Sequence, residues 1–489
     1  MLIIYKKCMR YFRVIKKAIN WGVKKYNNDK PLMIEWIIVG IISFIILCFF
    51  LHGDTENLIK WSLNIFDVTV KGKPLDFYKY SIENPNMAPD KYVSGTLYSL
   101  IIWAIWNIPI GIIKTIFGVE VLNNPLVYIW GKLFLVFCLC ITMFFVNKIV
   151  KKITGDVNRA KWAMFLLASS VFIYIGVYYG GQNDIVICAF ATAAVYCLMD
   201  GKNKWFYFFA GMAISVKYFF FIPYVAIILL LEKKVLKIIY KIVLGVIPTG
   251  IYWLITRACP MVSESASQGS PISVLLKEMV GGAFPVVFNN SISLFIGMLL
   301  IIYILAYLTI PQNDDEKYRY VIYYIVATSI SMLLFSTFQY YRVVMVCPFI
   351  AILMVIDKEK YRINVIMETI ISISLFIILI IQSGAYLFVS SVVNKNVVKF
   401  IFGISGVEGY FSLGMDVSRW ISNDMLTILL QIFATVVVIL SIFILVLNNP
   451  RAKLEFLDIP SIKIERWIYW VRTLVVVIPV FYVLGRLII

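Results

Sequence analysis

The sequence is short of the residues that soluble catalytic and metal-binding sites commonly use. Its single histidine, His52, excludes any metal site built from a cluster of histidines. None of its eight cysteines has the spacing of a metal site or of a disulfide framework. Charged residues make up only 15% of the chain, and no polar stretch is long enough to fold as a separate soluble domain.

Apolar residues are abundant and make up 61% of the 489 residues. Runs of about 20 apolar residues recur along the whole chain, and each is long enough to cross a bilayer as a helix. We therefore expect an all-α polytopic membrane protein.

Basic residues outnumber acidic ones by 45 to 27, and they gather at the N-terminus. Nine fall in residues 1–30, interleaved with apolar side chains, which predicts a cytoplasmic basic amphipathic helix on an anionic leaflet. The basic region is too long for a cleavable signal peptide. So much lipid-facing surface argues against nucleic acid as a partner and makes membrane lipids the expected contact.

The charge distribution also sets the predicted topology. The first span covers 33–52, and an external loop covers 53–126. If residues 97–113 lie along the outer surface instead of spanning, the basic segment 147–161 falls in the cytoplasm, as the positive-inside rule requires. The polar turn at 180–184 then lies outside.

Residues 205–231 form one apolar run, but the lysines that flank it at both ends favour the cytoplasm. Lys217 and Pro223 lie near its middle, where an unpaired charge in lipid is costly. We expect two short half-helices with Lys217 near their turn, at the floor of an externally open cavity, because broken helices are tolerated where they line a cavity. The whole chain then has about 13 transmembrane helices.

These spans divide into two predicted modules. An N-terminal catalytic transmembrane module covers 31–256, and a C-terminal transmembrane module covers 257–489 with external loops 257–290 and 388–423. The N-terminus is expected in the cytoplasm and the active site on the extracytoplasmic face of the cell membrane.

Acidic residues follow the first span. Asp54 comes directly after it, and Glu56 and Asp67 are further acids in the same loop. Their simplest interpretation is that they are solvated loop charges. Asp184 is expected to cap the helix that begins at Ile185, and that role can coexist with a functional one.

Two basic residues, Lys217 and Arg342, are expected within or near the membrane, where a charge is costly unless it has a role. Ionisable groups at membrane depth commonly have a function, so Lys217 is a candidate site residue. Arg342 either joins it or extends its side chain to the membrane boundary. Carboxylates, an amide and cations on one outer face suit transfer from a phosphorylated lipid, because a carboxylate can deprotonate an acceptor hydroxyl and cations can neutralise a departing phosphate.

Four stretches carry a likeness to a known family. "HGDTENLIKWSLNIF" at 52–66, followed by "KGKPLDFY", has an acid after the first span, a tryptophan-containing helix, and a glycine before an aromatic pair. "GGQND" at 180–184 is a Gly-Gln-x-Asp turn, and "AGMAISVKYFFFIP" places Lys-Tyr before a proline. The fourth stretch, "FQYYRVVMVCP", has the Gln339 and Tyr340 of a His-Pro-Gln-Tyr element but not its His and Pro. It also has a proline, Pro348, in the span that follows that element.

In these features the chain resembles the GT-C glycosyltransferases, polytopic enzymes that use polyprenyl-phosphate sugars on the external face. The likeness covers residues 33–350 and is nearest to the mannosyltransferase-like branches. It implies a single inverting displacement that moves a sugar from a polyprenyl-phosphate donor to a glycan, lipid or protein. The roles it implies are catalysis for Asp54, support from Glu56 and Asp67, sugar or acceptor binding for Gln182, Asn183, Asp184, Gln339 and Tyr340, and lipid-phosphate binding for Lys217, Tyr218 and Arg342.

Several alternatives stay open. No cofactor is expected, although some branches of that family use a divalent metal, which here would be Mg²⁺ or Mn²⁺ bound by oxygen atoms. A flippase or transporter of a lipid-linked or anionic solute would also use broken helices and buried cations, but the sequence shows no internal repeat. A polysaccharide polymerase or ligase would favour several external arginines, and few are expected here: Arg257, Arg342, Arg419 and Arg486.

Overall fold

The computed structural model describes residues 30–84, 93, 96–261, 283–285, 291–336, 340–382, 389, 393–403, 412–451 and 466–488. The amphipathic helix predicted within residues 1–30 lies outside these ranges, except for residue 30. Most of loop 257–290 and a third of loop 388–423 also lie outside them.

Helices account for most of the described chain. In residues 31–256 and just beyond they are α2 (Met33–Phe49), α3 (Gly53–Val70), η1 (Pro74–Asp76), α4 (Phe77–Glu83), α5 (Leu97–Trp106), α6 (Ile108–Phe117), η2 (Val119–Asn123), α7 (Pro125–Thr154), α8 (Val157–Ala168), α9 (Val171–Ile173), η3 (Tyr174–Tyr179), α10 (Asp184–Met199), α11 (Asn203–Val216), η4 (Tyr218–Phe220), α12 (Phe221–Leu231) and α13 (Val235–Ala258).

The C-terminal part of the chain continues in the same way. Its helices are α16 (Leu294–Leu308), α17 (Asp314–Phe335), η5 (Tyr340–Met345), α18 (Cys347–Ile356), α19 (Tyr361–Gln382), α20 (Lys395–Phe402), α21 (Leu413–Trp420), α22 (Asn423–Leu447), α23 (Trp467–Val475) and α24 (Ile478–Ile488). Within the described ranges the only strands are β1 (Ala283–Pro285) and β2 (Ser291–Ser293), an antiparallel pair in which Phe284 lies opposite Ile292.

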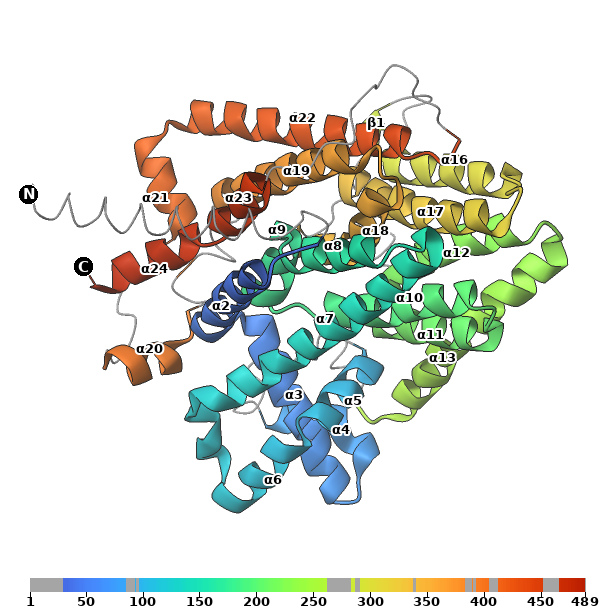
Figure 1. Cartoon of the computed structure of the whole chain (residues 1–489). Coiled ribbons are helices and arrows are strands. Elements are labelled where there is room, and N and C mark those ends of the chain that lie inside the picture. Colours follow the sequence, from blue (N-terminus) through green and yellow to red (C-terminus); the bar gives the residue numbers. More distant parts are fainter. Residues whose placement is uncertain are drawn as a thin grey trace, which may run out of the picture.

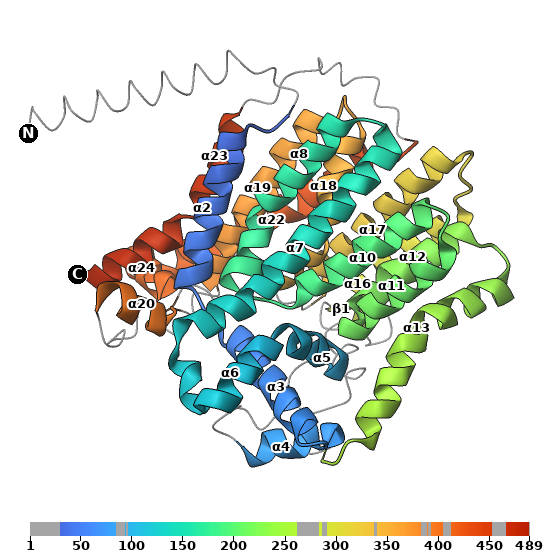
Figure 2. The ribbon, with the colours of Figure 1, turned by 60° about the horizontal axis from the view of Figure 1, so that its bottom comes forward.

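The helices form a bundle with a separate layer at one end. Helices such as α2, α7, α8, α10, α17 and α19 run side by side, while α3, α4, α5 and α6 gather beneath them (Figures 1 and 2). The segment predicted to lie along the outer surface, 97–113, falls in this end layer, where α5 and α6 are bent by 69° at the break between them.

The all-α membrane class is confirmed by these helices. Six are long and apolar enough to cross a membrane, or up to eight if each of two bent helix pairs is one span: α7, α13, α17, α19, α22 and the stretch from α23 into α24, with α5–α6 and α8–η3 as the pairs. Five shorter apolar helices complete the set: α2, α10, η4–α12, α16 and α18.

Helix ends coincide with residues that favour them. Asn124 caps α7 by accepting a hydrogen bond from the backbone N–H of Leu126, with Pro125 in the first helical position. Gly155 ends α7 with a left-handed φ of 65°, and Asp156 then caps α8. The chain therefore reverses within three residues, which sets α8 against α7.

The predicted break at Lys217 is confirmed. α11 ends at Val216, Lys217 has an extended backbone, and α12 follows after the short η4 helix. The ring of Phe206, in the first turn of α11, lies 5.8 Å from the ring of Tyr224 in α12. Eighteen residues of continuous helix would hold these rings about 27 Å apart, so the two half-helices fold back on each other.

Glycines let α11 and α12 pack closely against α13. Gly211 of α11 faces Gly245 and Pro248 of α13, and a Cβ atom at Gly211 would lie 2.6 Å from Pro248 Cγ and 2.8 Å from the Gly245 carbonyl oxygen. The Tyr224 hydroxyl covers Gly245 and donates to the Lys241 carbonyl (2.5 Å). The position of the half-helices thus depends on the absence of a side chain at this crossing.

Gly211→Ala is expected to lower the free energy of unfolding by about 1–3 kcal/mol, because the methyl group must push α13 away. The matched control is Gly250→Ala, an exposed α13 glycine with no atom near its Cβ position. That change is expected to be neutral or to stabilise the helix by roughly 0.5–1 kcal/mol. Thermal unfolding in detergent measures both, and equal melting temperatures would contradict the packing described.

Candidate active site at one end of the bundle

Asp54 lies in the first turn of α3, where the chain leaves the bundle for the end layer. The single histidine caps this helix, since His52 Nδ1 accepts a hydrogen bond from the Asp54 backbone N–H (3.2 Å). The Asp54 side chain is 48% exposed, and its Oδ2 accepts a hydrogen bond from Gln182 Nε2 (2.8 Å). Two residues 128 positions apart, both predicted for the site, are therefore in direct contact.

The turn at 180–184 owes its shape to a π-helix and a glycine. The π-helix η3 ends with the Gly180 N–H bonded to the Ile175 carbonyl (2.9 Å) and the Gln182 N–H bonded to the Gly176 carbonyl (2.8 Å). π-Helical turns occur often at functional sites.

Gly181 lets this turn touch the start of α3. It has a φ of +55°, and a Cβ atom there would lie 1.8 Å from Thr55 Oγ1. The Thr55 hydroxyl instead donates to the Gly181 carbonyl (2.9 Å). Only glycine fits this contact, which holds Gln182 in reach of Asp54.

Asn183 fixes the other side of the turn to α5. Its Oδ1 accepts a hydrogen bond from Trp103 Nε1 (2.9 Å), and its Nδ2 donates to Ser99 Oγ. The side chain is buried. Its amide, predicted to bind sugar or acceptor, is used at both ends to hold the turn on the end layer.

Asp184 has a different role from the predicted helix cap. The residue before α10 is Asn183, which makes no side-chain capping bond, and Asp184 is the first residue inside the helix. Its Oδ1 pairs with Lys217 Nζ at 2.8 Å, so the cap prediction is wrong because the nearby cation competes for the carboxylate. The Asp184 side chain is fully buried, and its Oδ2 has no hydrogen-bond partner among the described residues.

Lys217 connects this turn to the break between the half-helices. Its side chain is 24% exposed, so the ammonium can meet a ligand as well as Asp184. Phe219 lies two residues further along in η4, and the guanidinium carbon of Arg342 lies 4.5 Å from the centre of its ring. Arg342, on η5, is thereby held next to the half-helix turn that begins with Lys217 and Tyr218.

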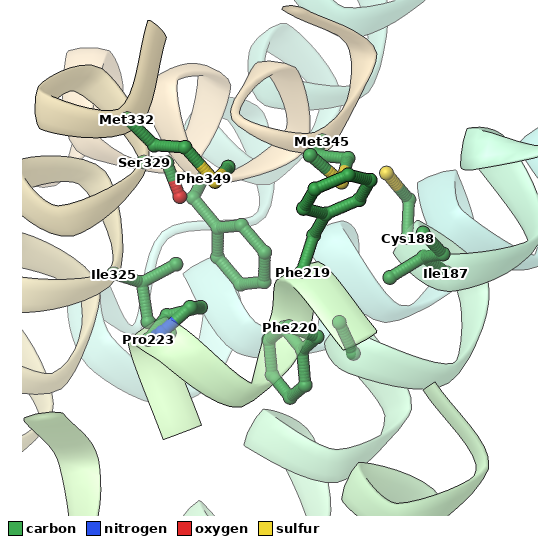
Figure 3. Close-up of a pocket in the computed structure, with 11 residues that line it drawn as sticks. Ile187, Cys188, Phe219, Phe220, Pro223, Ile325, Ser329, Met332, Met345 and Phe349 are labelled. Atoms are coloured by element: carbon green, nitrogen blue, oxygen red, sulfur yellow. The ribbon is translucent and has the colours of Figure 1, made fainter. Parts of the chain in front are cut away.

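A small cavity lies beside this turn (Figure 3). It is mostly apolar and measures about 10 Å³, roughly the room of one water molecule. Phe219 and Phe220 of η4, Cys188 of α10 and Met345 of η5 are among the residues that line it. The larger open cavity predicted around Lys217 stays a prediction.

The remaining predicted site residues are not joined to this group. Glu56 pairs with Lys60 one turn along α3 (2.6 Å). Asp67 lies 13 residues beyond Asp54, about 20 Å along the same helix, where it pairs with Lys114 of α6 and accepts from the Tyr80 hydroxyl (3.1 Å). It therefore stabilises the end layer.

The predicted site residues Gln339 and Tyr340 are only partly described by the structure. Gln339 lies outside the described residues. Tyr340 begins η5, and only its backbone is described. Among the described residues, no group of three or more metal-ligating side chains comes together.

The sequence does not single out one lysine that the structure places behind this site. Lys132 of α7 is buried, and its ammonium donates to the backbone carbonyls of Leu47 (2.9 Å), Phe50 (2.5 Å) and Tyr178 (2.8 Å). The first two carbonyls end α2, just before Asp54, and the third precedes the turn that carries Gln182. The signal was present, because Lys132 is a charge within an apolar run, as Lys217 is.

The C-terminal helices support the same turn from behind. The Tyr179 hydroxyl donates to the Val476 carbonyl (2.5 Å), between α23 and α24. Deeper in the bundle, Arg472 of α23 pairs with Glu368 of α19 (3.1 Å), and Ser170, just before α9, donates to the same carboxylate (3.1 Å). The end of the chain is thus part of the frame that positions the turn.

Lys132→Met should lower the free energy of unfolding by about 3 kcal/mol or more, because it leaves three buried carbonyls without a partner. Lys148→Met is the matched control, since Lys148 lies on the same helix with an exposed side chain. Thermal unfolding in detergent measures both changes. Loss of stability of the same size in the two variants would contradict the proposed clamp.

Comparison of the chain with profiles of known protein families, with curated proteins and with solved structures finds no match.

Proposed function

We propose that the chain is a membrane glycosyltransferase of the GT-C type, which moves a sugar from a polyprenyl-phosphate donor to a glycan, lipid or protein acceptor. The observation that carries the proposal is a row of four side chains in which the 180–184 turn links two hydrogen-bonded pairs, Asp54 with Gln182 and Asp184 with Lys217, each at 2.8 Å. The row has an accessible carboxylate at one end and accessible cationic charge at the other.

Asp54 serves as the general base. Its carboxylate is half exposed, its Oδ2 is oriented by Gln182, and a carboxylate so placed can take the proton of an acceptor hydroxyl. The hydroxyl oxygen then attacks the anomeric carbon. The bond from that carbon to the phosphate oxygen breaks in the same step, and the sugar inverts.

Lys217 and Arg342 receive the leaving group. The electron pair of the broken bond departs with the polyprenyl phosphate, whose charge these two cations neutralise. Asp184 holds the Lys217 ammonium in place. We propose no metal for this displacement.

The proposed topology has 13 spans, with the N-terminus in the cytoplasm and the row on the extracytoplasmic face. The spans are α2, α7, α8–η3, α10, α11, α12, α13, α16, α17, α18, α19, α22 and α23–α24. The bent pair α5–α6 lies in the outer layer beside α3. Modules 31–256 and 257–489 then meet at the turn.

Loop 388–423 is proposed to help choose the acceptor. Its described residues include Asn394, whose backbone N–H donates to the Phe49 carbonyl (2.8 Å) at the end of α2. Phe50 also forms a β-bridge with Val393. This loop therefore lies against the corner from which Asp54 emerges.

A flippase or transporter is the second candidate function, and the ion pair of Lys217 with buried Asp184 at a helix break is the observation that favours it. A flippase has no need of an accessible base, however, and would move lipid after Asp54 is replaced. A polymerase or ligase is less consistent with the structure, because Arg419 and Arg486 pair with Asp416 and Arg257 stacks on Trp253.

Asp54→Asn is expected to reduce kcat for glycosyl transfer in membranes at least about 100-fold, the usual contribution of a general base. Asp67→Asn makes the same change on the same helix and should retain most of the activity. Expression and thermal stability of both variants show that they fold. Full activity in the Asp54 variant, or equal losses in the two, would refute the assignment of the base.

Lys217→Met should weaken inhibition by the product polyprenyl phosphate about 10- to 100-fold, the value of one lost charge-assisted hydrogen bond. Lys148→Met, on the exposed face of α7, serves as its control. Inhibition that is unchanged in the Lys217 variant would move the phosphate site elsewhere.

A further inference from the structure

A second cavity lies beside the row, between the end layer and α13. It measures about 470 Å³ and is bounded by three walls: the C-terminal half of α3 with η1, the helix α5 with the start of α6, and the end of α13. Its lining residues are almost all aliphatic. Buried Leu97 and Ala104 form its inner side, while Ile105 (63% exposed) and Leu75 (46%) lie at its rim.

The lining offers no free side-chain hydrogen-bond donor. Two of its residues carry a polar hydrogen, and both use it within their own helix: the Thr69 hydroxyl donates to the Ile65 carbonyl (2.6 Å), and Cys259 Sγ to the Ile255 carbonyl (3.4 Å). A sugar or a peptide would lose hydrogen bonds to water on entering such a space. A hydrocarbon chain would gain from burial there.

The groove opens toward lipid. Only 11% of the most apolar stretch of α13 is buried inside the protein, which leaves this helix facing the bilayer. Ile255, on that surface, also lines the groove. Near the same end of α13, Arg257 stacks on Trp253 (3.9 Å), a pairing typical of the membrane boundary.

The other end of the groove reaches the catalytic row. Leu97 lines it at the start of α5, and the preceding residue, Thr96, donates its hydroxyl to the carbonyl of Val216 (3.2 Å), directly before Lys217. α5 therefore has two faces. Ser99 and Trp103 hold the turn through Asn183 on one face, while Leu97, Ile101, Ala104 and Ile105 line the groove on the other.

We propose that this groove binds the hydrocarbon chain of a lipid phosphate whose phosphate lies at Lys217. The proposal rests on the proposed function for the identity of that lipid, the polyprenyl-phosphate donor. The hydrocarbon chain enters the groove from the surface of α13 and follows α5. Its phosphate end lies where the half-helices turn. The groove then binds the segment of the hydrocarbon chain next to the phosphate, whereas the site around Asp54 binds the sugar.

The test uses binding of lipid phosphates to the full-length protein in nanodiscs, so that it does not depend on transfer. Ile105→Trp and Leu75→Trp fill the groove from opposite walls, and both replace exposed side chains, so the fold should tolerate them. Each should weaken binding of undecaprenyl phosphate about tenfold through lost apolar burial. Binding of citronellyl phosphate, whose two-unit chain is too short to fill the groove, should change much less.

Ile112→Trp is the matched control, because Ile112 is an exposed isoleucine (50%) on α6 that does not line the groove. A diazirine-bearing undecaprenyl phosphate should label peptides of α3, α5 and α13, and excess undecaprenyl phosphate should prevent the labelling. Equal competition by phosphatidylglycerol would mean an ordinary bilayer lipid and overturn the proposal. Unchanged affinity in both groove variants would also overturn it.

The outcomes separate this inference from the proposed function. If labelling and affinity follow the groove but Asp54→Asn leaves transfer intact, the lipid site stands and the assignment of Asp54 fails. If transfer depends on Asp54 but the groove variants bind normally, the enzyme stands and the chain lies elsewhere.

Discussion

Lys132 uses all three hydrogens of its ammonium group to hold together two segments that are far apart in the sequence. Its partners are the carbonyls of Leu47, Phe50 and Tyr178, and the ammonium pairs with no carboxylate among the described residues. The last carbonyls of a helix lack partners and carry its partial negative charge, so a cation satisfies both needs at the end of α2. In a membrane the cost of separating these groups is high, and the corner before Asp54 is therefore fixed to the π-helix before Gln182.

The rest of the site follows from that joint. Once the corner and the π-helix are held together, Gly181 brings the turn against Thr55, and Gln182 reaches Asp54. The turn then starts α10 with Asp184 directed at Lys217. The helices α19, α23 and α24 close the frame from behind through Glu368, Arg472 and the Val476 carbonyl. A site of a few polar side chains is thus held in place by helices from the N-terminal and the C-terminal parts of the chain.

The sequence predicted the parts of this arrangement that charge and membrane depth determine. The break at Lys217 followed from flanking lysines that could not lie on opposite sides, and the contact between Asp54 and the 180–184 turn followed from the topology together with the family resemblance. The sequence alone could not exclude Asp67 from the site around Asp54, because the distance of Asp67 from the turn depends on α3 being a continuous helix to Val70. The Asp184 cap was wrong because a local rule ignored a cation 33 residues away. Lys132 was overlooked because its carbonyl partners come together only in the fold.

The central claim is that a lipid phosphate and a general base lie at opposite ends of the row that begins at Asp54. The most direct measurement is the position of the phosphate in an experimental structure of the full chain with undecaprenyl phosphate bound in a nanodisc. We expect phosphate density in hydrogen-bond contact with Lys217 Nζ and facing Arg342, on the side of the turn that carries Gln182. Phosphate bound on another face of the bundle, with Lys217 still paired only to Asp184, would contradict it.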